Sequence, residues 1–266
     1  MEKTAISPSF SDFFDTVEHT DTVEYFLLIV CACGAGFVQR TVGFGFGIFL
    51  IPLLFLLGVM GGDYKSIVSL SSMMAATLSL ITVWDLRKSL DWRFIWPLLI
   101  VFIPTSTFFS YVMFGTDASW LKIILGITLI LLSIYFTFFK KDGIKIKPNW
   151  FNTISLGSLS GLMGGLFSMQ GPPVVYYYLS TQKTKEEYMA QTQCFFLLGN
   201  LWMTILRAGE GIITAEVGKS YLIAIAGCLA GMWIGARIYN KMNNGLLLKV
   251  IYIFLAYSGV SMIIGQ

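Results

Sequence analysis

The sequence predicts an all-α polytopic membrane protein built from two inverted repeats, each a broken helical hairpin followed by three transmembrane helices. Hydrophobic residues make up 56% of the chain and charged residues 12%, a composition too apolar for a water-soluble domain of this length. Apolar runs such as 94–113 and 120–139 have the length of membrane helices of about 20 residues, rather than of alternating barrel strands. Two other apolar stretches are interrupted by glycines at corresponding places.

Residues 1–22 form an acidic N-terminal segment in which Lys3 is the only basic residue. This charge is opposite to the basic start of a signal peptide, so the segment is expected to belong to the mature protein. A helix on the membrane surface is one interpretation, because apolar residues recur there at helical spacing: Phe10, Phe13, Phe14 and Val17. A frayed acidic tail is the other.

The first repeat is predicted over residues 23–139. Its opening apolar stretch, 23–58, would be roughly 54 Å long as one helix, against a hydrocarbon core of about 30 Å. The stretch must therefore break, and three alternate glycines mark the place: Gly43, Gly45 and Gly47. Alternate glycines share no helix face, so close helix packing does not explain them. Three ordinary spans are expected to follow, at 67–83, 94–113 and 120–139.

A basic linker at 140–149, expected in the cytoplasm, separates this unit from a second repeat at 150–266. The stretch 151–179 is interrupted by Gly164 and Gly165 and then by a Ser-Met-Gln-Gly-Pro-Pro segment, 168–173. The later spans are predicted at 188–206, 217–235 and 246–264, the first of them starting at a capping box of Thr184 and Glu187. The matching order indicates an internal duplication.

The distribution of basic residues favours hairpins that return to the face they came from, because short cytoplasmic loops are enriched in Lys and Arg. The chain has 18 basic residues, of which Arg40 is set aside. If each interrupted stretch crosses the membrane once, the other basic residues fall 10 on one side of the membrane and 7 on the other; if each is a hairpin, they fall 12 and 5. The hairpin arrangement gives each half five segments. The halves are then inverted, and both termini lie outside the cytoplasm. The twelve residues on the cytoplasmic side would be Arg87, Lys88, Arg93, Lys140, Lys141, Lys145, Lys147, Lys183, Lys185, Arg237, Lys241 and Lys249.

Broken helices expose backbone groups that lipid tolerates only where they line a cavity or are buried in protein, so the candidate site lies where the two breaks meet. Prolines suit the first turn of a helix, and the free amides at such a helix end suit an anion. The predicted substrate-binding residues are Gln39, Arg40, Gly43, Gly45 and Gly47 at the first break, Ser168, Gln170, Gly171, Pro172 and Val174 at the second, and Gln193 and Asn200 within a span. An alternative for Arg40 is that it anchors the hairpin at the cytoplasmic face by snorkelling.

The residue inventory argues against an enzyme. No Asp or Glu falls in the middle of a predicted span, the single histidine is His19 in the N-terminal segment, and the four cysteines lie in apolar runs where such residues usually pack. We therefore expect no catalytic residue, no metal site and no cofactor. Coupling to protons through a buried carboxylate is also unsupported.

At the two breaks the sequence resembles the sulfite exporter TauE/SafE family of membrane transporters. The first copy of the family pattern reads Gly34-Ala-Gly-Phe, then Gly43-Phe-Gly-Phe-Gly47, then Ile51-Pro52-Leu53. The second copy runs from Gly157-Ser-Leu-Ser-Gly161 to Gln170-Gly171-Pro172-Pro173. The phenylalanines of the first turn, and Ser168-Met169-Gln170 before the second Gly-Pro-Pro, depart from the pattern. The resemblance implies export of a small anion such as sulfite, sulfoacetate, or a similar sulfonate or carboxylate.

The expected function is therefore that of a secondary transporter moving such an anion out of a prokaryotic cytoplasm, across the inner membrane, by alternating access. An anion-selective channel with the hairpin tips as its constriction is the alternative. The expected partners are the anionic substrate and membrane lipid, with a homodimer left open and no nucleic acid.

Overall fold

The computed structural model describes residues 10–138, 148–238 and 244–264, and within these ranges the regular structure is entirely helical. Five of the helices are long and apolar enough to cross a membrane. The chain is an integral membrane protein of the all-α polytopic class, as predicted. Residues 140–147 of the expected linker lie outside the described residues.

Twelve helical elements follow one another in the described chain. Those before the linker are α1 Phe10–Val42, α2 Phe46–Leu56, η1 Val59–Gly62, α3 Tyr64–Leu86, η2 Arg87–Ser89, α4 Trp92–Gly115 and α5 Ala118–Phe138. Those after it are α6 Trp150–Phe167, α7 Gly171–Thr181, α8 Lys185–Gly209, α9 Ala215–Ile238 and α10 Asn244–Ile264. Each of the six ordinary spans expected from the sequence coincides with one long helix: α3, α4, α5, α8, α9 or α10.

The first predicted break is confirmed. Helix α1 ends at Val42, and the chain turns through Gly43 and Gly45, whose φ angles of 86° and 99° lie in the left-handed region. The short helix α2 then runs back along α1. After α2, the backbone amide of Met60 donates to the carboxylate of Glu24 near the start of the membrane portion of α1. The chain therefore returns to the end of the bundle from which it came.

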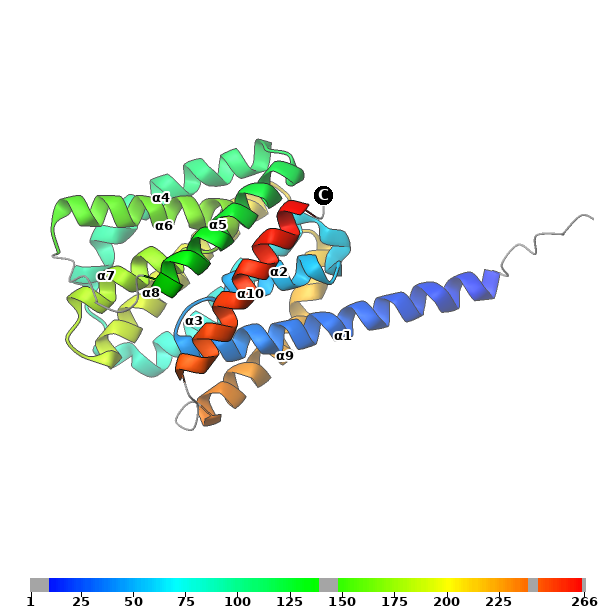
Figure 1. Ribbon diagram of the computed structural model, residues 1–266, viewed down its shortest axis with the longest axis horizontal. Coiled ribbons are helices and arrows are strands. Elements are labelled where there is room, and N and C mark those ends of the chain that lie inside the picture. Colours follow the sequence, from blue (N-terminus) through cyan, green and yellow to red (C-terminus); the bar gives the residue numbers. More distant parts are fainter. Residues whose placement is uncertain (1–9, 139–147, 239–243, 265–266) are drawn as a thin grey trace, which may run out of the picture.

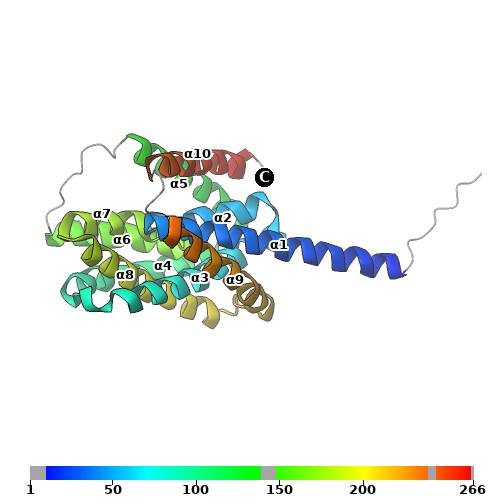
Figure 2. The same ribbon diagram turned by 90° about the horizontal axis from the view of Figure 1, so that it is seen from below.

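The N-terminal part of α1 continues without a break from Phe10 into the membrane portion Thr22–Val42. It projects beyond the bundle in both ribbon views (Figures 1 and 2). The acidic segment is thus helical from Phe10 and forms one rod with the first span.

The second break is also confirmed. Helix α6 ends at Phe167, Ser168 adopts a left-handed conformation with φ 54°, and α7 begins at Gly171 with prolines in its first turn. The hydroxyls of Thr153 and Tyr177 lie 3.3 Å apart. Because one residue is near the start of α6 and the other near the end of α7, this second hairpin doubles back as well.

Glycines allow the long helices to approach closely. Helix α1 packs on α9 at Gly227 and Gly231, where an added Cβ would lie 2.3 and 1.9 Å from backbone oxygens of α1. Helix α6 packs on α4 through Gly157 and Gly161, as small residues at this spacing predict. Helices α5 and α10 form a pair beside α2, and α3 packs against α8 (Figures 1 and 2).

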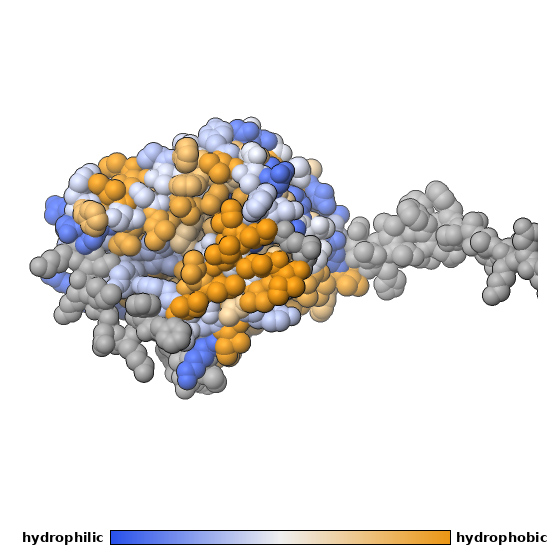
Figure 3. All heavy atoms as spheres, turned by 45° about the horizontal axis from the view of Figure 1, so that its top comes forward, coloured by the Kyte–Doolittle hydropathy of each residue, from blue (hydrophilic) through white to orange (hydrophobic). Residues whose placement is uncertain are grey.

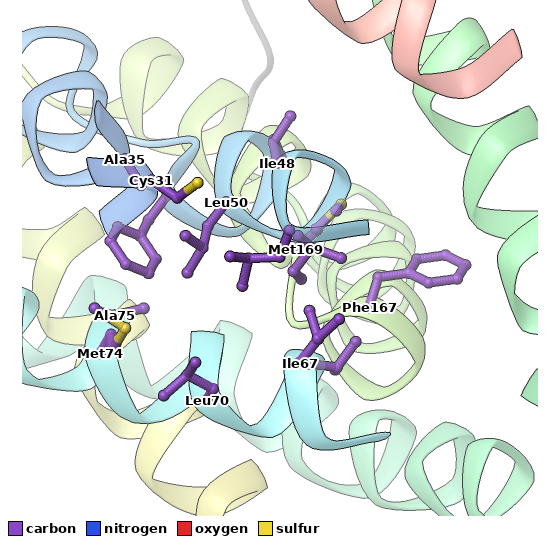
Figure 4. Close-up of a cluster of buried hydrophobic side chains, with 14 of the residues drawn as sticks. Cys31, Ala35, Ile48, Leu50, Ile67, Leu70, Met74, Ala75, Phe167 and Met169 are labelled. Carbon is purple, nitrogen blue, oxygen red and sulfur yellow. The ribbon is translucent and has the colours of Figure 1, made fainter. Parts of the chain in front are cut away.

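Large apolar side chains cover much of the outer surface. Figure 3 shows hydrophobic residues gathered across one face, with most hydrophilic residues toward its margins. Leu222, Ile253 and Phe151 are 71%, 70% and 75% exposed, which is unfavourable in water and suits contact with lipid tails. The interior contains an apolar cluster to which Ile48 of α2, Leu70 of α3 and Met169 all belong (Figure 4).

Candidate functional site

The two hairpin turns meet in the middle of the bundle. A Cβ added to Gly47 at the start of α2 would lie 2.9 Å from the carbonyl oxygen of Ser168. The corresponding position at Gly171, where α7 begins, is 3.6 Å from the Cβ of Phe44 in the first turn. The two turns, about 120 residues apart in sequence, therefore touch each other. Position 47 requires glycine, because a side chain there would collide with the backbone of the second turn.

A small cavity lies where the turns meet. Helices α2 and α7 both begin at its wall, so two helix N-termini, each carrying roughly half a positive charge, face the same space. Helices α1, α3 and α8 complete the lining. The lining residues are Gln39, Gly45, Phe46, Gly47, Ile48, Ala75, Ser168, Met169, Gln170, Gly171, Phe196 and Asn200.

Two glutamines hold the first turn in place. The Nε2 of Gln193 donates to the carbonyl oxygen of Gly43 at 2.8 Å, and its Oε1 accepts from Gln39 Nε2 at 3.2 Å and from Ser79 Oγ at 3.0 Å. Gln39 Oε1 in turn accepts from the backbone amide of Phe46 at 3.3 Å. This network ties α1, α3 and α8 to the turn, so the start of α2 has a fixed position.

The second turn is fixed by side chains on both sides of the break. Ser160 Oγ donates to the carbonyl oxygen of Gln170 at 2.6 Å, and Ser168 Oγ donates to that of Val68 on α3 at 3.1 Å. The Nε2 of Gln170 donates to the carbonyl oxygen of Phe196 on α8 at 3.1 Å. The side chains of Ser168 and Gln170, which line the cavity, are therefore oriented by bonds to neighbouring helices.

The cavity offers hydrogen-bonding groups that the protein itself does not use. The first-turn amides of a helix have no partner within that helix. At α2 the amide of Phe46 is bonded to Gln39, which leaves the amides of Gly47 and Ile48 at the cavity wall. Gln170 Oε1 and Asn200 Oδ1 are buried and have no hydrogen-bond partner in the described part of the chain. A small polar ligand would satisfy groups of this kind.

Seven predicted substrate-binding residues line the cavity together: Gln39, Gly45, Gly47, Ser168, Gln170, Gly171 and Asn200. Gly43 and Gln193 lie behind the wall in the glutamine network, and Pro172 and Val174 are buried in the first turn of α7. Arg40 does not line the cavity. Its Cβ lies 3.1 Å from the position that a Cβ on Gly235 of α9 would occupy, on another side of α1.

Sequence reasoning missed Arg207. This residue lies near the C-terminal end of α8, where the sequence suggests a basic residue at the membrane interface, but the structure buries it fully. Its guanidinium donates to Ser168 Oγ at 2.6 Å, to Ser72 Oγ at 3.0 Å and to the carbonyl oxygen of Gly165 at 3.3 Å. The available signal was the spacing Asn200 to Arg207, because residues seven apart share a helix face.

Comparison with known proteins gives the family. The model of the family described as "Sulfite exporter TauE/SafE" matches residues 28–262, which include both hairpin turns, the whole of α2 to α9 and parts of α1 and α10. No curated protein and no solved structure matches the chain. The family is one of transporters, and membership implies membrane transport of sulfur anions such as sulfite. Since the match covers both turns that build the cavity, the chain belongs to the sulfite exporter TauE/SafE family.

Proposed function

We propose that this protein is a secondary transporter that exports a small organosulfur or organic anion, such as sulfite, sulfoacetate or a similar sulfonate or carboxylate, across the cytoplasmic membrane. The binding site is the cavity between the two hairpin turns. One observation carries the proposal: the N-termini of α2 and α7 open on a single space inside the bundle. Two converging helix N-termini favour a negatively charged ligand.

The residues that line the cavity suit a negatively charged ligand. The lining includes amide and hydroxyl groups and no carboxylate, so nothing in it repels an anion through a full negative charge. Apolar side chains such as Phe46 and Phe196 make up much of the remainder. A small site with few polar groups in apolar surroundings suits a compact anion of a few atoms.

Helix packing supports the inverted duplication. In such a duplication α1–α5 correspond in order to α6–α10. The packing of α1 on α9 then corresponds to that of α6 on α4, and the pairs α3–α8 and α5–α10 each join two equivalent helices. All four of these packings occur. Five helices in each half invert the second half relative to the first. Such a site at the interface of inverted repeats is suited to alternating access, in which the two halves rock around it.

Flux measurements in proteoliposomes test the proposal. The purified protein is reconstituted, and counterflow of labelled sulfite and sulfoacetate is compared with that of protein-free vesicles. We expect saturable exchange of at least one of these anions, and a large loss in the Gln170→Ala variant, because this residue lines the cavity and orients the second turn. Absence of exchange of both anions by folded protein would refute the proposal.

The same vesicles decide two further points. Arg40→Ala abolishes exchange if this side chain contacts the substrate during the cycle, and leaves it intact if the residue only anchors α1 against α9. Unitary currents in a planar bilayer would identify a channel, since a carrier gives saturable flux without them.

A further inference from the structure

Arg207 is a buried cation to which the described part of the chain supplies no counter-ion. Its four hydrogen-bond acceptors are the hydroxyls of Ser72 and Ser168 and the carbonyl oxygens of Val68 and Gly165, all of them neutral. Its Nε has no hydrogen-bond partner, and within the described ranges it forms no ion pair with a carboxylate. The side chain has no exposed surface.

Such an arrangement is costly for stability alone. An arginine side chain stays protonated in proteins, so a full positive charge is held away from water. Burying a charge without an opposite partner destabilises a fold by several kcal/mol, and ionisable residues inside membrane helices commonly mark the path of a substrate. The missing negative charge is therefore the feature that requires an explanation.

The position of Arg207 supplies one. Its shortest hydrogen bond, 2.6 Å, goes to Ser168 Oγ, and Ser168 lines the cavity at which α2 and α7 begin. The cation is thus separated from the cavity by a single side chain. Charges interact strongly at this separation because the surrounding protein has a low dielectric constant.

We propose that Arg207 is the fixed counter-charge of the anion site and gives it a preference for substrates with two negative charges over substrates with one. Arg207 acts through Ser168 and is therefore a positioning residue. Arg207 contributes one positive charge behind Ser168, and the N-termini of α2 and α7 contribute roughly half a charge each. A bound dianion therefore leaves the buried region about neutral, whereas a monoanion leaves a net positive charge in the membrane interior. This inference rests on the proposed function, because it assumes that the cavity binds the transported anion.

A purely structural role is the competing explanation. Gly165 lies in the last turn of α6, and a cation that bonds its carbonyl oxygen caps that helix end and stabilises the turn. That role predicts lower stability on substitution, with no change in how the protein ranks anions by charge. The charge preference is therefore the measurement that separates the two explanations.

The experiment uses methanesulfonate and sulfate, two tetrahedral sulfur oxyanions that carry one and two charges at neutral pH. Labelled-anion uptake into proteoliposomes gives kcat/KM for each. For the unsubstituted protein we expect sulfate to be favoured by about tenfold or more. Arg207→Lys should keep this preference, since it retains the charge, whereas Arg207→Gln should bring the two anions to within about threefold of each other and slow sulfate uptake about tenfold. Lys122→Gln removes a cation located at Phe55, outside the cavity, and should leave the preference unchanged.

Folding is checked by size-exclusion profile and thermal unfolding in detergent. If Arg207→Gln fails to fold, Ser168→Ala replaces it: this variant retains the arginine but removes the acceptor at the cavity wall, and should also weaken the preference. A full preference in Arg207→Gln or in its replacement would overturn the inference, as would equal uptake of both anions by the unsubstituted protein. If the unsubstituted protein transports neither these anions nor sulfite and sulfoacetate, the proposed function itself fails.

Discussion

The side-chain amide of Gln193 on α8 donates to the carbonyl oxygen of Gly43 at 2.8 Å, which ties the first hairpin turn to a helix of the other half of the chain. The two residues are 150 positions apart in sequence. Since Gly43 has a φ of 86° and precedes the short helix α2, this one bond helps to fix the direction in which α2 meets the cavity.

Gln193→Leu should therefore impair both stability and substrate binding. The substitution leaves the carbonyl of Gly43 and the amide of Gln39 without their partner, a loss of about 1–3 kcal/mol in the free energy of unfolding. Because the turn then loses its fixed position, KM for the transported anion should rise about tenfold. Thermal unfolding in detergent and proteoliposome flux measure the two effects.

Gln191→Leu is the matched control. Gln191 is buried on the same helix and bonds the carbonyl oxygen of Ser89 and the amide of Asp91, in the connection between α3 and α4. Its loss should lower stability by a similar amount without changing KM. Equal KM changes in the two variants would show that the Gln193 bond has no special relation to the site.

Backbone conformation at Gly45 gives a second prediction. Its φ of 99° lies where side chains are strained, although an added Cβ would have room, its nearest neighbour being Val38 at 3.7 Å. Gly45→Ala should cost about 1–2 kcal/mol of unfolding free energy through strain, and should lower flux because Gly45 lines the cavity. Chemical denaturation and counterflow assays measure the two consequences.

Gly58→Ala is the control variant: it introduces similar backbone strain at a position that does not line the cavity. This glycine has a φ of 65° and no atom within 4 Å of an added Cβ, and it lies away from the cavity. A similar loss of stability with unchanged flux is expected. If Gly45→Ala left flux at the level of Gly58→Ala, the first turn would not need its present shape for transport.

Packing of α1 on α9 gives a third prediction. A methyl group at Gly231 would lie 1.9 Å from the carbonyl oxygen of Cys33, so Gly231→Ala should separate the helices and lower the free energy of unfolding by about 1–3 kcal/mol. Gly218→Ala, on the same helix with nothing within 4 Å, should instead raise it by up to about 1 kcal/mol, because alanine favours helix. Opposite signs in denaturation midpoints confirm the contact, and equal signs contradict it.

Sequence reasoning reached the hairpins because their signals are local. A stretch too long for one crossing, interrupted by Gly43, Gly45 and Gly47, has few alternatives in lipid, and Pro172 suits the first turn of a helix. The capping box that begins α8 was likewise readable, and Thr184 and Glu187 form it in the structure. Local backbone chemistry thus determined where helices begin and end.

Long-range arrangement could not be read in the same way. The spacing from Asn200 places Arg207 on the same face of α8, but it does not show that the guanidinium reaches Ser168, because its burial depends on α3, α6 and α8 packing around it. The neighbouring polar residues Arg40 and Gln39 illustrate the same limit: both precede the first turn, but only Gln39 faces the cavity. Which side of a helix faces the site depends on contacts between segments far apart in sequence.

Membrane orientation gives the last prediction. Both hairpins return to the end of the bundle they came from, so Pro148 before α6 and Lys183 after α7 should be on the same side of the membrane, which the basic residues identify as the cytoplasm. Single cysteines at these positions should react with an impermeant maleimide only in inside-out vesicles, and a cysteine at Glu210, after α8, only in intact cells. The native cysteines that the structure describes are buried or half-buried and give the background to subtract. Labelling of positions 148 and 183 from opposite sides would require α6 and α7 to form a single crossing, and would exclude the proposed inversion of the two halves.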